Sequence, residues 1–373
     1  MSLAKHRWFK RFIPLALAAV AVTAFIGGCG GDDDDGGSTT PTVTATASAP
    51  VTPTESAQQR VQERLQGVPG IVDPGNLSWP REVEGLNGKR TIKAKPTKIH
   101  TMSAGIDEIT LSLVPLERVV AVGSATKNPD TTSFAPLVQG LPTAAREPEA
   151  VVATGAELVI ATPTQKADVV AAIEGAGVTV IQLNLDPTPA GRLNAILLLG
   201  YIYGEEERAI ALADEVQARY EKVVSVTGKK SEADKPVVAS VAKYTTVTMA
   251  GAGSTGEGII TAAGGRNAGT AAGLKGNPQV GFEALVATNP DVIIIPMPAE
   301  AGGKFKAELL AEPSLATVPA VKNGKVYVVP PPLYTTNSFA NVRAVEHLAH
   351  ILWPSEFPVA DPPQFSLAGQ AAR

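Results

Sequence analysis

Apolar and polar positions alternate along most of this chain with two different periods. Short runs rich in Val and Ile, such as residues 158–161 and 292–295, predict buried β-strands. The longer stretches between them carry apolar residues at three- and four-residue steps, which predicts helices. Regular alternation of the two predicts an α/β fold with helices on a parallel sheet. We expect strands at 98–102, 119–122, 158–161, 178–183, 237–241, 292–295 and 325–329, and helices at 106–113, 167–175, 256–263, 282–287 and 342–352.

One long amphipathic segment, residues 205–226, lies between two such alternating halves. Three glutamates begin it, where negative charge suits the positive end of a helix dipole. A helix of 22 residues is about 33 Å long, close to one domain diameter. We therefore expect one stiff helix to join two α/β lobes. Its apolar residues recur on a single face: Ala209, Leu212, Ala213, Val216, Tyr220 and Val223.

An internal repeat supports two equivalent lobes. Residues 149–160 align without gaps on residues 283–294, with six of twelve positions identical. Each copy is predicted to form a short helix, a turn and a buried strand. Chance or a shared local solution is the alternative explanation for so short a match.

The first residues carry a pattern typical of secretion. A positively charged start precedes an apolar run at 12–26, which is shorter than the roughly 20 residues of a membrane span. Gly27 and Gly28 then lead to Cys29, the single cysteine, and residues 26–29 resemble the lipobox of bacterial lipoproteins. The resemblance implies that Cys29 carries a diacylglyceryl group with fatty acids such as palmitate. The alternative is a free thiol after an uncleaved anchor.

These patterns divide the chain into six parts. After the signal peptide comes a segment rich in Asp, Gly, Thr and Pro, with too little apolar surface to fold, and a hairpin at 79–95 then opens the first lobe. We expect a signal peptide at 1–28, a lipidated disordered tether at 29–78, an N-terminal lobe at 79–204, the interlobe helix at 205–226, a C-terminal lobe at 227–357 and a tail at 358–373.

Composition narrows the function. Charged residues make up 18% of the chain and the net charge is −4, which gives no indication of nucleic-acid binding. Four histidines and one cysteine leave little material for a metal site built by the protein. Beyond the signal peptide, no apolar run is long enough to span a bilayer, so we expect attachment to the membrane through lipid only.

Several segments in order resemble a known family, the substrate-binding proteins of iron-siderophore, heme and cobalamin ABC importers. They are residues 96–103, 107–114, 118–122, the two repeat copies and 323–329. The resemblance implies two α/β lobes joined by a rigid helix, with a ligand cleft between the lobes that closes only slightly. It also implies a monomer without enzymatic activity, on the outer face of the cytoplasmic membrane, that delivers its ligand to a permease dimer with an ATPase.

Two glutamates in the repeat are candidates for docking. By the resemblance, Glu149 and Glu283 project from one lobe each and pair with arginines of the two permease subunits. The alternative is that both simply stabilise the start of a helix.

Ligands of open α/β sheets bind outside the carboxyl ends of the strands, which gives a set of candidate cleft residues. The N-lobe rim loops at 124–128 and 142–147 contain no aromatic residue, whereas heme and corrins favour aromatic walls. Cationic side chains suit an anionic ferric chelate, so a ferric siderophore is favoured over heme or cobalamin, with no cofactor besides the ligand itself. The candidates are Ser103, Ala104, Lys127, Arg146, Thr162, Lys243, Tyr244, Ser254 and Tyr334.

Other chemistries are weakly supported. Residues 251–256 match the letters of a dinucleotide-binding loop, but no acidic residue follows about 20 positions on. A hydrolase triad of His100, Ser103 and Asp107 has poor strand geometry. His347 and His350 have metal-ligand spacing but no third ligand nearby. The rival function from another class is a structural or adhesive surface lipoprotein that has no transport role.

Overall fold

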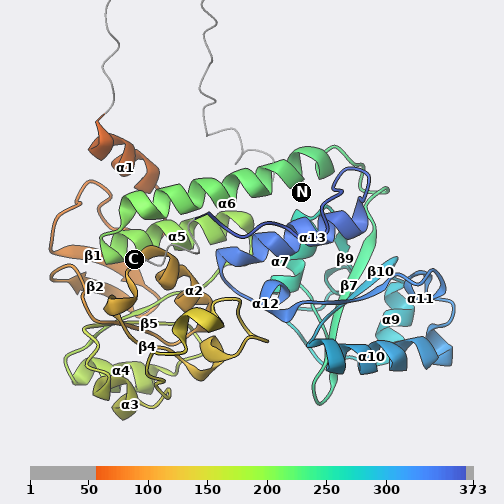
Figure 1. Cartoon of the computed structure of the whole chain (residues 1–373), viewed down its shortest axis with the longest axis horizontal. Helices are drawn as coiled ribbons and strands as arrows, with labels where there is room; N and C mark the ends of the chain where they lie inside the picture. The colour runs from red at the N-terminus through yellow and green to blue at the C-terminus, as the bar shows by residue number, and fades with distance from the viewer. Residues whose placement is uncertain (1–55, 367–373) are drawn as a thin grey trace, which may run out of the picture. The chain divides into compact units, whose positions relative to one another are not determined.

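The computed structural model describes residues 56–366, which form two α/β lobes (Figure 1). The predicted α/β class with parallel sheets is confirmed. The predicted signal peptide and Cys29 lie outside the described residues. Within the described range, no helix has the length and apolar character needed to span a membrane.

The N-terminal lobe contains a four-stranded parallel sheet in the order β4-β3-β5-β6. Helices pack on both faces of this sheet, so every side chain of β5 is buried. The strands are β3 (Ile99–Thr101), β4 (Val119–Ala121), β5 (Leu158–Ala161) and β6 (Thr179–Gln182). One face is covered by α2 (Ala104–Leu113) and α5 (Pro189–Tyr203), and the other by α3 (Pro148–Ala153) and α4 (Ala167–Gly175).

The C-terminal lobe repeats this arrangement. Its parallel strands have the order β9-β7-β10-β11, and β8 adds an antiparallel hairpin to β7. β10 thus occupies the place of β5, and each follows a short helix, as the repeat predicts. The strands are β7 (Val237–Lys243), β8 (Val247–Met249), β9 (Arg266–Asn267), β10 (Val292–Pro296) and β11 (Val326–Val329). The main helices are α7 (Thr255–Ala262), α9 (Phe282–Thr288), α10 (Ala299–Ala311) and α13 (Val342–Leu352).

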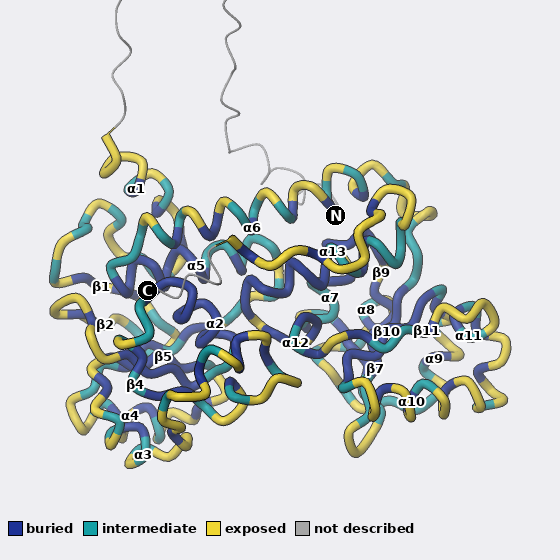
Figure 2. The backbone as a smooth tube through the Cα atoms, viewed as in Figure 1, coloured by how far each residue is buried: buried dark blue, intermediate teal, exposed yellow. Residues whose placement is uncertain are grey.

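The predicted interlobe helix is α6 (Glu206–Thr227), and it does not act alone. Helix α5 precedes it in the chain and packs along it, and the two helices are joined by a turn at Gly204, which has a φ of +71°. A Cβ at Gly200 would lie 2.2 Å from Cβ of Ala209, so only glycine allows this close approach of α5 and α6. Figure 2 shows α5 deeply buried, whereas α6 alternates between buried and exposed residues.

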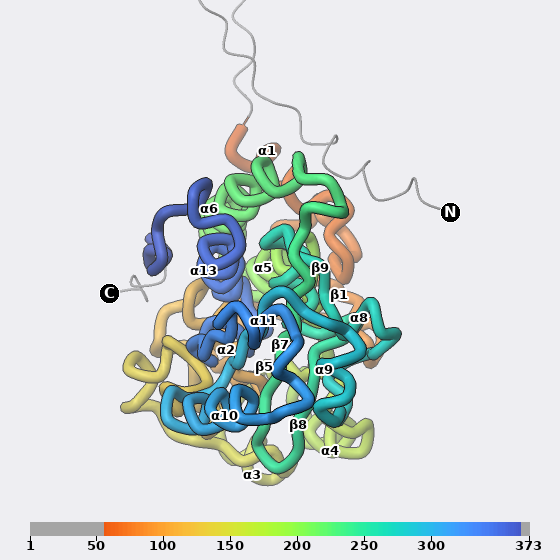
Figure 3. Tube along the Cα trace, turned by 90° about the vertical axis from the view of Figure 1, so that its right-hand side faces the viewer, coloured from red at the N-terminus to blue at the C-terminus, as the bar shows by residue number. Residues whose placement is uncertain are grey.

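One apolar cluster continues through both lobes. It joins Leu158 and Ile160 of β5 to Ile294 of β10 through the buried faces of α5, α6 and α13. The predicted stiff connection therefore rests on a shared core, because separating the lobes would expose part of that cluster. Figure 3 shows α6 and α13 on the opposite side of the molecule from α3 and α10.

The remaining elements are short. They are α1 (Ala57–Leu65), β1 (Arg81–Gly85), β2 (Gly88–Ile92), α8 (Ala268–Ala271), α11 (Pro319–Lys322) and α12 (Pro331–Tyr334), with 3₁₀ turns η2 (Leu116–Arg118), η3 (Ser124–Lys127), η4 (Ala135–Val138), η5 (Pro313–Leu315) and η6 (Phe339–Asn341). The predicted hairpin is the antiparallel pair β1–β2.

Both ends of the described chain pack more closely than the predicted boundaries imply. The disordered tether was predicted to reach residue 78, but α1 begins at Ala57 with a capping box formed by Ser56 and Gln59. Leu65 is fully buried in the common core. In the predicted tail, Phe365 is 5% exposed, and its ring packs edge-to-face on that of Phe339 with the ring centroids 4.8 Å apart.

Candidate functional site

A cavity of about 440 Å³ lies at the carboxyl ends of the N-lobe strands. The loops after β3, β5 and β6 form most of its wall, and the opposite wall comes from residues 335–337, which follow α12 of the C-terminal half. The described residues that line it are Met102, Ser103, Ala104, Gly105, Ala125, Thr131, Arg146, Thr162, Pro163, Thr164, Asn184, Leu185, Thr335, Thr336 and Asn337. This cleft is the candidate ligand site.

Four of the residues predicted from sequence come together in this cleft: Ser103, Ala104, Arg146 and Thr162. Ser103 is the N-cap of α2 but its side chain makes no capping hydrogen bond. The positive end of α2 is thus directed to the cleft wall. Whether these residues contact a ligand stays a prediction.

Two predicted cationic residues are engaged elsewhere. Nζ of Lys127 donates to the carbonyl oxygens of Gln139 at 3.1 Å and Leu141 at 2.5 Å. Lys243 forms an ion pair with Glu308 of α10 at 2.6 Å. Neither lines the cleft, so the predicted placement of both is corrected.

Three further predicted residues also lie outside the cleft wall. Tyr334 is 3% exposed and its hydroxyl bonds to Nδ1 of His347 at 2.7 Å. Ser254 is 4% exposed and caps α7, since its hydroxyl oxygen accepts from the backbone N–H of Glu257 at 3.1 Å. Tyr244 is 72% exposed in the turn between β7 and β8. All three predictions were based on proximity to a strand end, which does not fix where a side chain points.

Sequence reasoning missed two parts of the wall. Asn184 and Leu185 directly follow the predicted strand at 178–183, so the strand-end rule could have found them. Thr335, Thr336 and Asn337 directly follow Tyr334, so the strand-end rule found this region but selected the wrong residue within it.

The cleft wall combines polar and apolar groups. It offers hydroxyl and amide groups, and Arg146 is the one charged residue among the described residues that line the cleft. None of those residues is aromatic, acidic, His or Cys. The thioether of Met102 belongs to the apolar cluster beneath α3 and α4. Such a wall can hold an anionic or hydrogen-bonding ligand, but it offers few ligands to a metal ion.

Two adjacent carboxyl groups are buried just behind this wall, on α2. Asp107 accepts hydrogen bonds from the hydroxyls of Thr101 and Thr126, both at 2.5 Å. Burial nevertheless raises the pKa of Asp107 to about 7. Burial likewise raises the pKa of Glu108, while hydroxyl donors and the charge of Arg192 oppose the shift.

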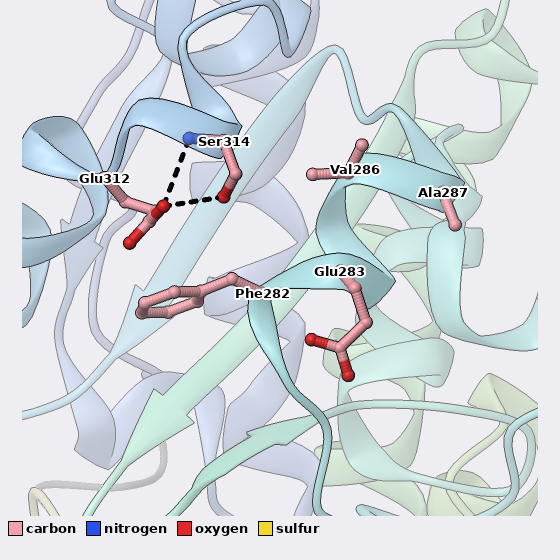
Figure 4. A pocket seen from close by; sticks show the side chains of 6 residues that line it. All are labelled: Phe282, Glu283, Val286, Ala287, Glu312 and Ser314. Atoms are coloured by element: carbon pink, nitrogen blue, oxygen red, sulfur yellow. Dashed lines mark hydrogen bonds between the residues drawn. The ribbon is translucent and has the colours of Figure 1, made fainter.

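The two docking candidates begin corresponding helices. Glu149 lies in the first turn of α3 and Glu283 in the first turn of α9, and both are exposed. The carboxylate of Glu283 folds back over Gly281, where a Cβ would lie 2.1 Å from it. Figure 4 shows Phe282 and Glu283 leaving the start of α9 in different directions. Phe282 and Glu283 border a surface cavity of about 540 Å³, together with Val286, Ala287, Glu312 and Ser314.

The histidines have structural partners. Nδ1 of His100 bonds to the carbonyl oxygen of Ala121 at 2.9 Å, and burial lowers the pKa of this imidazole. His350 bonds to the carbonyl oxygen of Phe357 at 2.7 Å. Among residues 56–366, no group of His, Cys, Asp and Glu is arranged to hold a metal ion.

Comparison with known proteins gives a consistent result. The model of the periplasmic binding protein family matches residues 99–333. A curated relative from Bacillus subtilis (strain 168), an uncharacterized ABC transporter substrate-binding lipoprotein named YvrC, is 24% identical over 310 residues, which cover 82% of this chain and 92% of that protein.

Solved structures share the fold. The periplasmic heme-binding protein RhuT from Roseiflexus sp. RS-1 has a TM-score of 0.59 at 21% identity and covers 69% of this chain and 98% of its own. The molybdate periplasmic binding protein MolA of Haemophilus influenzae, bound to molybdate, has a TM-score of 0.62 at 18% identity, covering 74% and 93%. At these identities the similarity shows the fold alone.

Proposed function

The chain belongs to the periplasmic binding protein family, and from this premise we propose that it captures an anionic ferric chelate, a siderophore complex, for import. The general function of the family is that of a substrate-binding protein of an ABC importer, which is not an enzyme. The permease and ATPase of that importer are therefore its partners. The proposal concerns the identity of the ligand.

The composition of the cleft wall carries the proposal. Arg146 and the start of α2 favour negative charge, and hydroxyl and amide groups of Thr162, Asn184 and Asn337 can bond to the outside of a chelate. A siderophore already fills the coordination sphere of its iron, so it needs no metal ligand from the protein. The protein accordingly requires no cofactor of its own.

Heme is the main alternative ligand, because several proteins with this fold are described as heme-binding. Heme in a protein commonly has an axial His, Cys, Met or Tyr ligand, and flat macrocycles favour aromatic walls. The described wall supplies none of these except the core residue Met102. A corrinoid presents a similarly broad ring, and the same argument applies to it.

A calorimetric titration of the purified protein tests the ligand class. We expect a ferric hydroxamate or ferric catecholate siderophore to bind, and hemin and cyanocobalamin not to. Arg146→Ala should weaken binding about 10- to 100-fold, because a hydrogen bond to a charged group contributes about 1.5–3 kcal/mol. Lys127→Ala is the matched control and should change affinity by less than about twofold, since its ammonium group bonds to carbonyls away from the cleft.

Two outcomes would contradict the proposal. If hemin or cyanocobalamin binds tightly and no ferric siderophore binds, the ligand is a macrocycle and not a siderophore. Failure of all these compounds to bind, together with normal growth on every chelate after gene deletion, would favour the structural or adhesive lipoprotein.

We further propose that the protein is a monomer held by lipid at Cys29 on the outer face of the cytoplasmic membrane, and that Glu149 and Glu283 dock it on the permease. The lipoprotein character of the Bacillus relative supports the anchor. The corresponding positions of α3 and α9 in two similar lobes support paired docking, because a permease dimer offers two matching surfaces.

A further inference from the structure

The wall of the cleft contributed by the C-terminal half is a short segment, residues 335–338, which connects α12 to η6. Burial alternates along it: Thr335 and Asn337 are exposed, whereas Thr336 is 6% and Ser338 0% exposed. Thr335, Thr336 and Asn337 line the cavity, whereas Ser338 does not. The buried hydroxyls of Thr336 and Ser338 point to the contacts that hold this wall.

The buried hydroxyls of this segment bond to a carboxylate of the other lobe. Thr336 donates to Oε2 of Glu108 at 2.6 Å, and Ser338 donates to the same oxygen. The second oxygen, Oε1, accepts from Thr132 of the N-terminal lobe. Glu108 therefore joins α2 to a segment 228 residues further along the chain.

A second contact holds the backbone between these two hydroxyls. Nη1 of Arg192, on α5, donates to the carbonyl oxygen of Asn337. Arg192 is 1% exposed, and its Nε and Nη2 have no hydrogen-bond partner among the described residues. A buried guanidinium with this single backbone contact is costly, so its position is not explained by local packing alone.

Close packing around Asn337 also holds this segment against the N-terminal lobe. A Cβ at Gly105 would lie 3.1 Å from Cβ of Asn337, so the first turn of α2 is in close contact with the segment. The side-chain oxygen of Asn337 accepts from the hydroxyl of Thr255 at the start of α7, at 2.6 Å. The segment is thus tied to the N-terminal lobe by α2 and α5, and to its own lobe by α7.

We propose that Glu108 and Arg192 are positioning residues for the ligand cleft, which fix residues 335–338 against the N-terminal lobe so that the cleft is formed before ligand arrives. Neither residue lines the cavity. They act through Thr336, Asn337 and Ser338, which they hold by hydrogen bonds. The proposed role in ligand capture rests on the function proposed above, whereas the anchoring itself does not.

The neighbouring carboxyl group provides a matched control. Asp107 is equally buried on the same helix, but both of its hydroxyl donors, Thr101 and Thr126, belong to the N-terminal lobe. Asp107→Asn and Glu108→Gln are both amide replacements of a buried carboxyl group. Only the second changes the carboxyl oxygens that the 335–338 segment bonds to.

Hydrogen–deuterium exchange of the purified protein without ligand tests the anchoring. The backbone N–H groups of Ser338 and Ala340 bond to the hydroxyls of Thr336 and Ser338, so they report directly on this segment. We expect exchange across 336–341 to accelerate at least about tenfold in Glu108→Gln and in Arg192→Lys, and to change less than about twofold in Asp107→Asn.

The chain offers a second pair of variants should Glu108→Gln or Arg192→Lys fail to fold. Thr336→Val removes the hydroxyl at constant shape and should accelerate exchange of 336–341, whereas Thr336→Ser retains the hydroxyl and should restore protection. Unchanged protection of 336–341 in both Glu108→Gln and Thr336→Val would overturn the proposal. Equal acceleration in Asp107→Asn would overturn it too, because both carboxyl groups would then only stabilise the fold.

A ferric hydroxamate siderophore serves as the probe for the functional part. Its affinity should fall at least about fivefold in Glu108→Gln or, should that variant not fold, in Ser338→Ala, because neither residue lines the cavity, and it should stay within about twofold in Asp107→Asn. Loss of protection without loss of affinity would confine the role of Glu108 to structure. Since the exchange experiment uses no ligand, failure of this siderophore to bind would count against the ligand class and not against the anchoring.

Discussion

At the scale of single residues, the position of a charge in the fold matters more than its presence in the sequence. Lys127, Arg146 and Lys243 all follow predicted strands or lie near them, yet only Arg146 lines the cleft. The other two cations are satisfied by carbonyl groups and by Glu308. Arg146 is therefore the one cationic side chain among these three that lines the cleft.

Asp107 carries a prediction about pH. Its pKa is raised from 3.8 to about 7 in the folded protein, so the folded state binds more protons than the unfolded state between these values. The stability contributed by the protonated group is complete below about pH 4 and is lost as pH rises through about 7.

Asp107→Asn should remove this dependence. Relative to the wild type, its free energy of unfolding should increase between pH 5 and 8 by a few kcal/mol, at about 1.4 kcal/mol per unit of pKa shift. Urea denaturation at several pH values measures the difference, which cancels the contribution of other groups such as His100. If the free energies of unfolding of the two proteins changed with pH in parallel, the pKa of Asp107 would not be raised in the folded protein.

At the scale of elements, α3 and α9 occupy corresponding positions and start with the same acidic residue. Each lies on the face of its sheet away from α6, packed against β5 or β10. Neither Glu149 nor Glu283 lines the cleft, so replacing them tests the proposed docking without changing the cleft wall.

Replacing Glu149 and Glu283 together by alanine should leave siderophore affinity in solution within about twofold while uptake by cells falls sharply. An exposed ion pair contributes about 0–1 kcal/mol, but truncating a desolvated pair costs about 2–5 kcal/mol, so each single change should give a partial defect. Lysine at both positions should reduce uptake more than alanine does, because its positive charge would then face the permease arginines.

Glu300→Ala is the control for this experiment, since Glu300 is also an exposed glutamate in a first helical turn but pairs with Lys304 of its own helix. It should transport normally. Full uptake by the double alanine variant would leave Glu149 and Glu283 as residues that only stabilise helix starts.

At the scale of the whole molecule, the common core through α5, α6 and α13 limits relative movement of the lobes. Opening the lobes widely would expose buried side chains of all three helices, at about 25 cal/mol for each Å² of apolar surface. The radius of gyration from small-angle X-ray scattering should therefore be nearly the same with and without a ferric siderophore. A clear compaction on binding would indicate hinge closure instead.

The membrane anchor is a second prediction at this scale. Mass spectrometry of protein from its native membrane should find a mature N-terminus at Cys29 carrying a diacylglyceryl group. In Cys29→Ser, the chain should not be lipidated and should leave the membrane fraction after processing or remain as a precursor. An intact Met1 with an unmodified thiol in the wild type would contradict the assignment.

The sequence by itself determined the class of fold and the order of most of its parallel strands, because strand and helix periodicity and the repeated helix–turn–strand are local properties. It also indicated α6, whose one-sided apolar pattern is visible in the chain. Helix α5 was missed because residues 195–203 are buried on all sides, and an apolar segment without a polar face has no helical period.

Only the tertiary structure decided which side chains meet at the cleft. Tyr334 and Lys243 found partners, His347 and Glu308, that strand position does not predict. The contact of Glu108 with Thr336 spans 228 residues, so no local pattern could indicate that a carboxyl group on α2 holds the far wall. Local sequence fixes elements because their hydrogen bonds are local, whereas a binding site depends on pairs of residues that only the folded chain brings together.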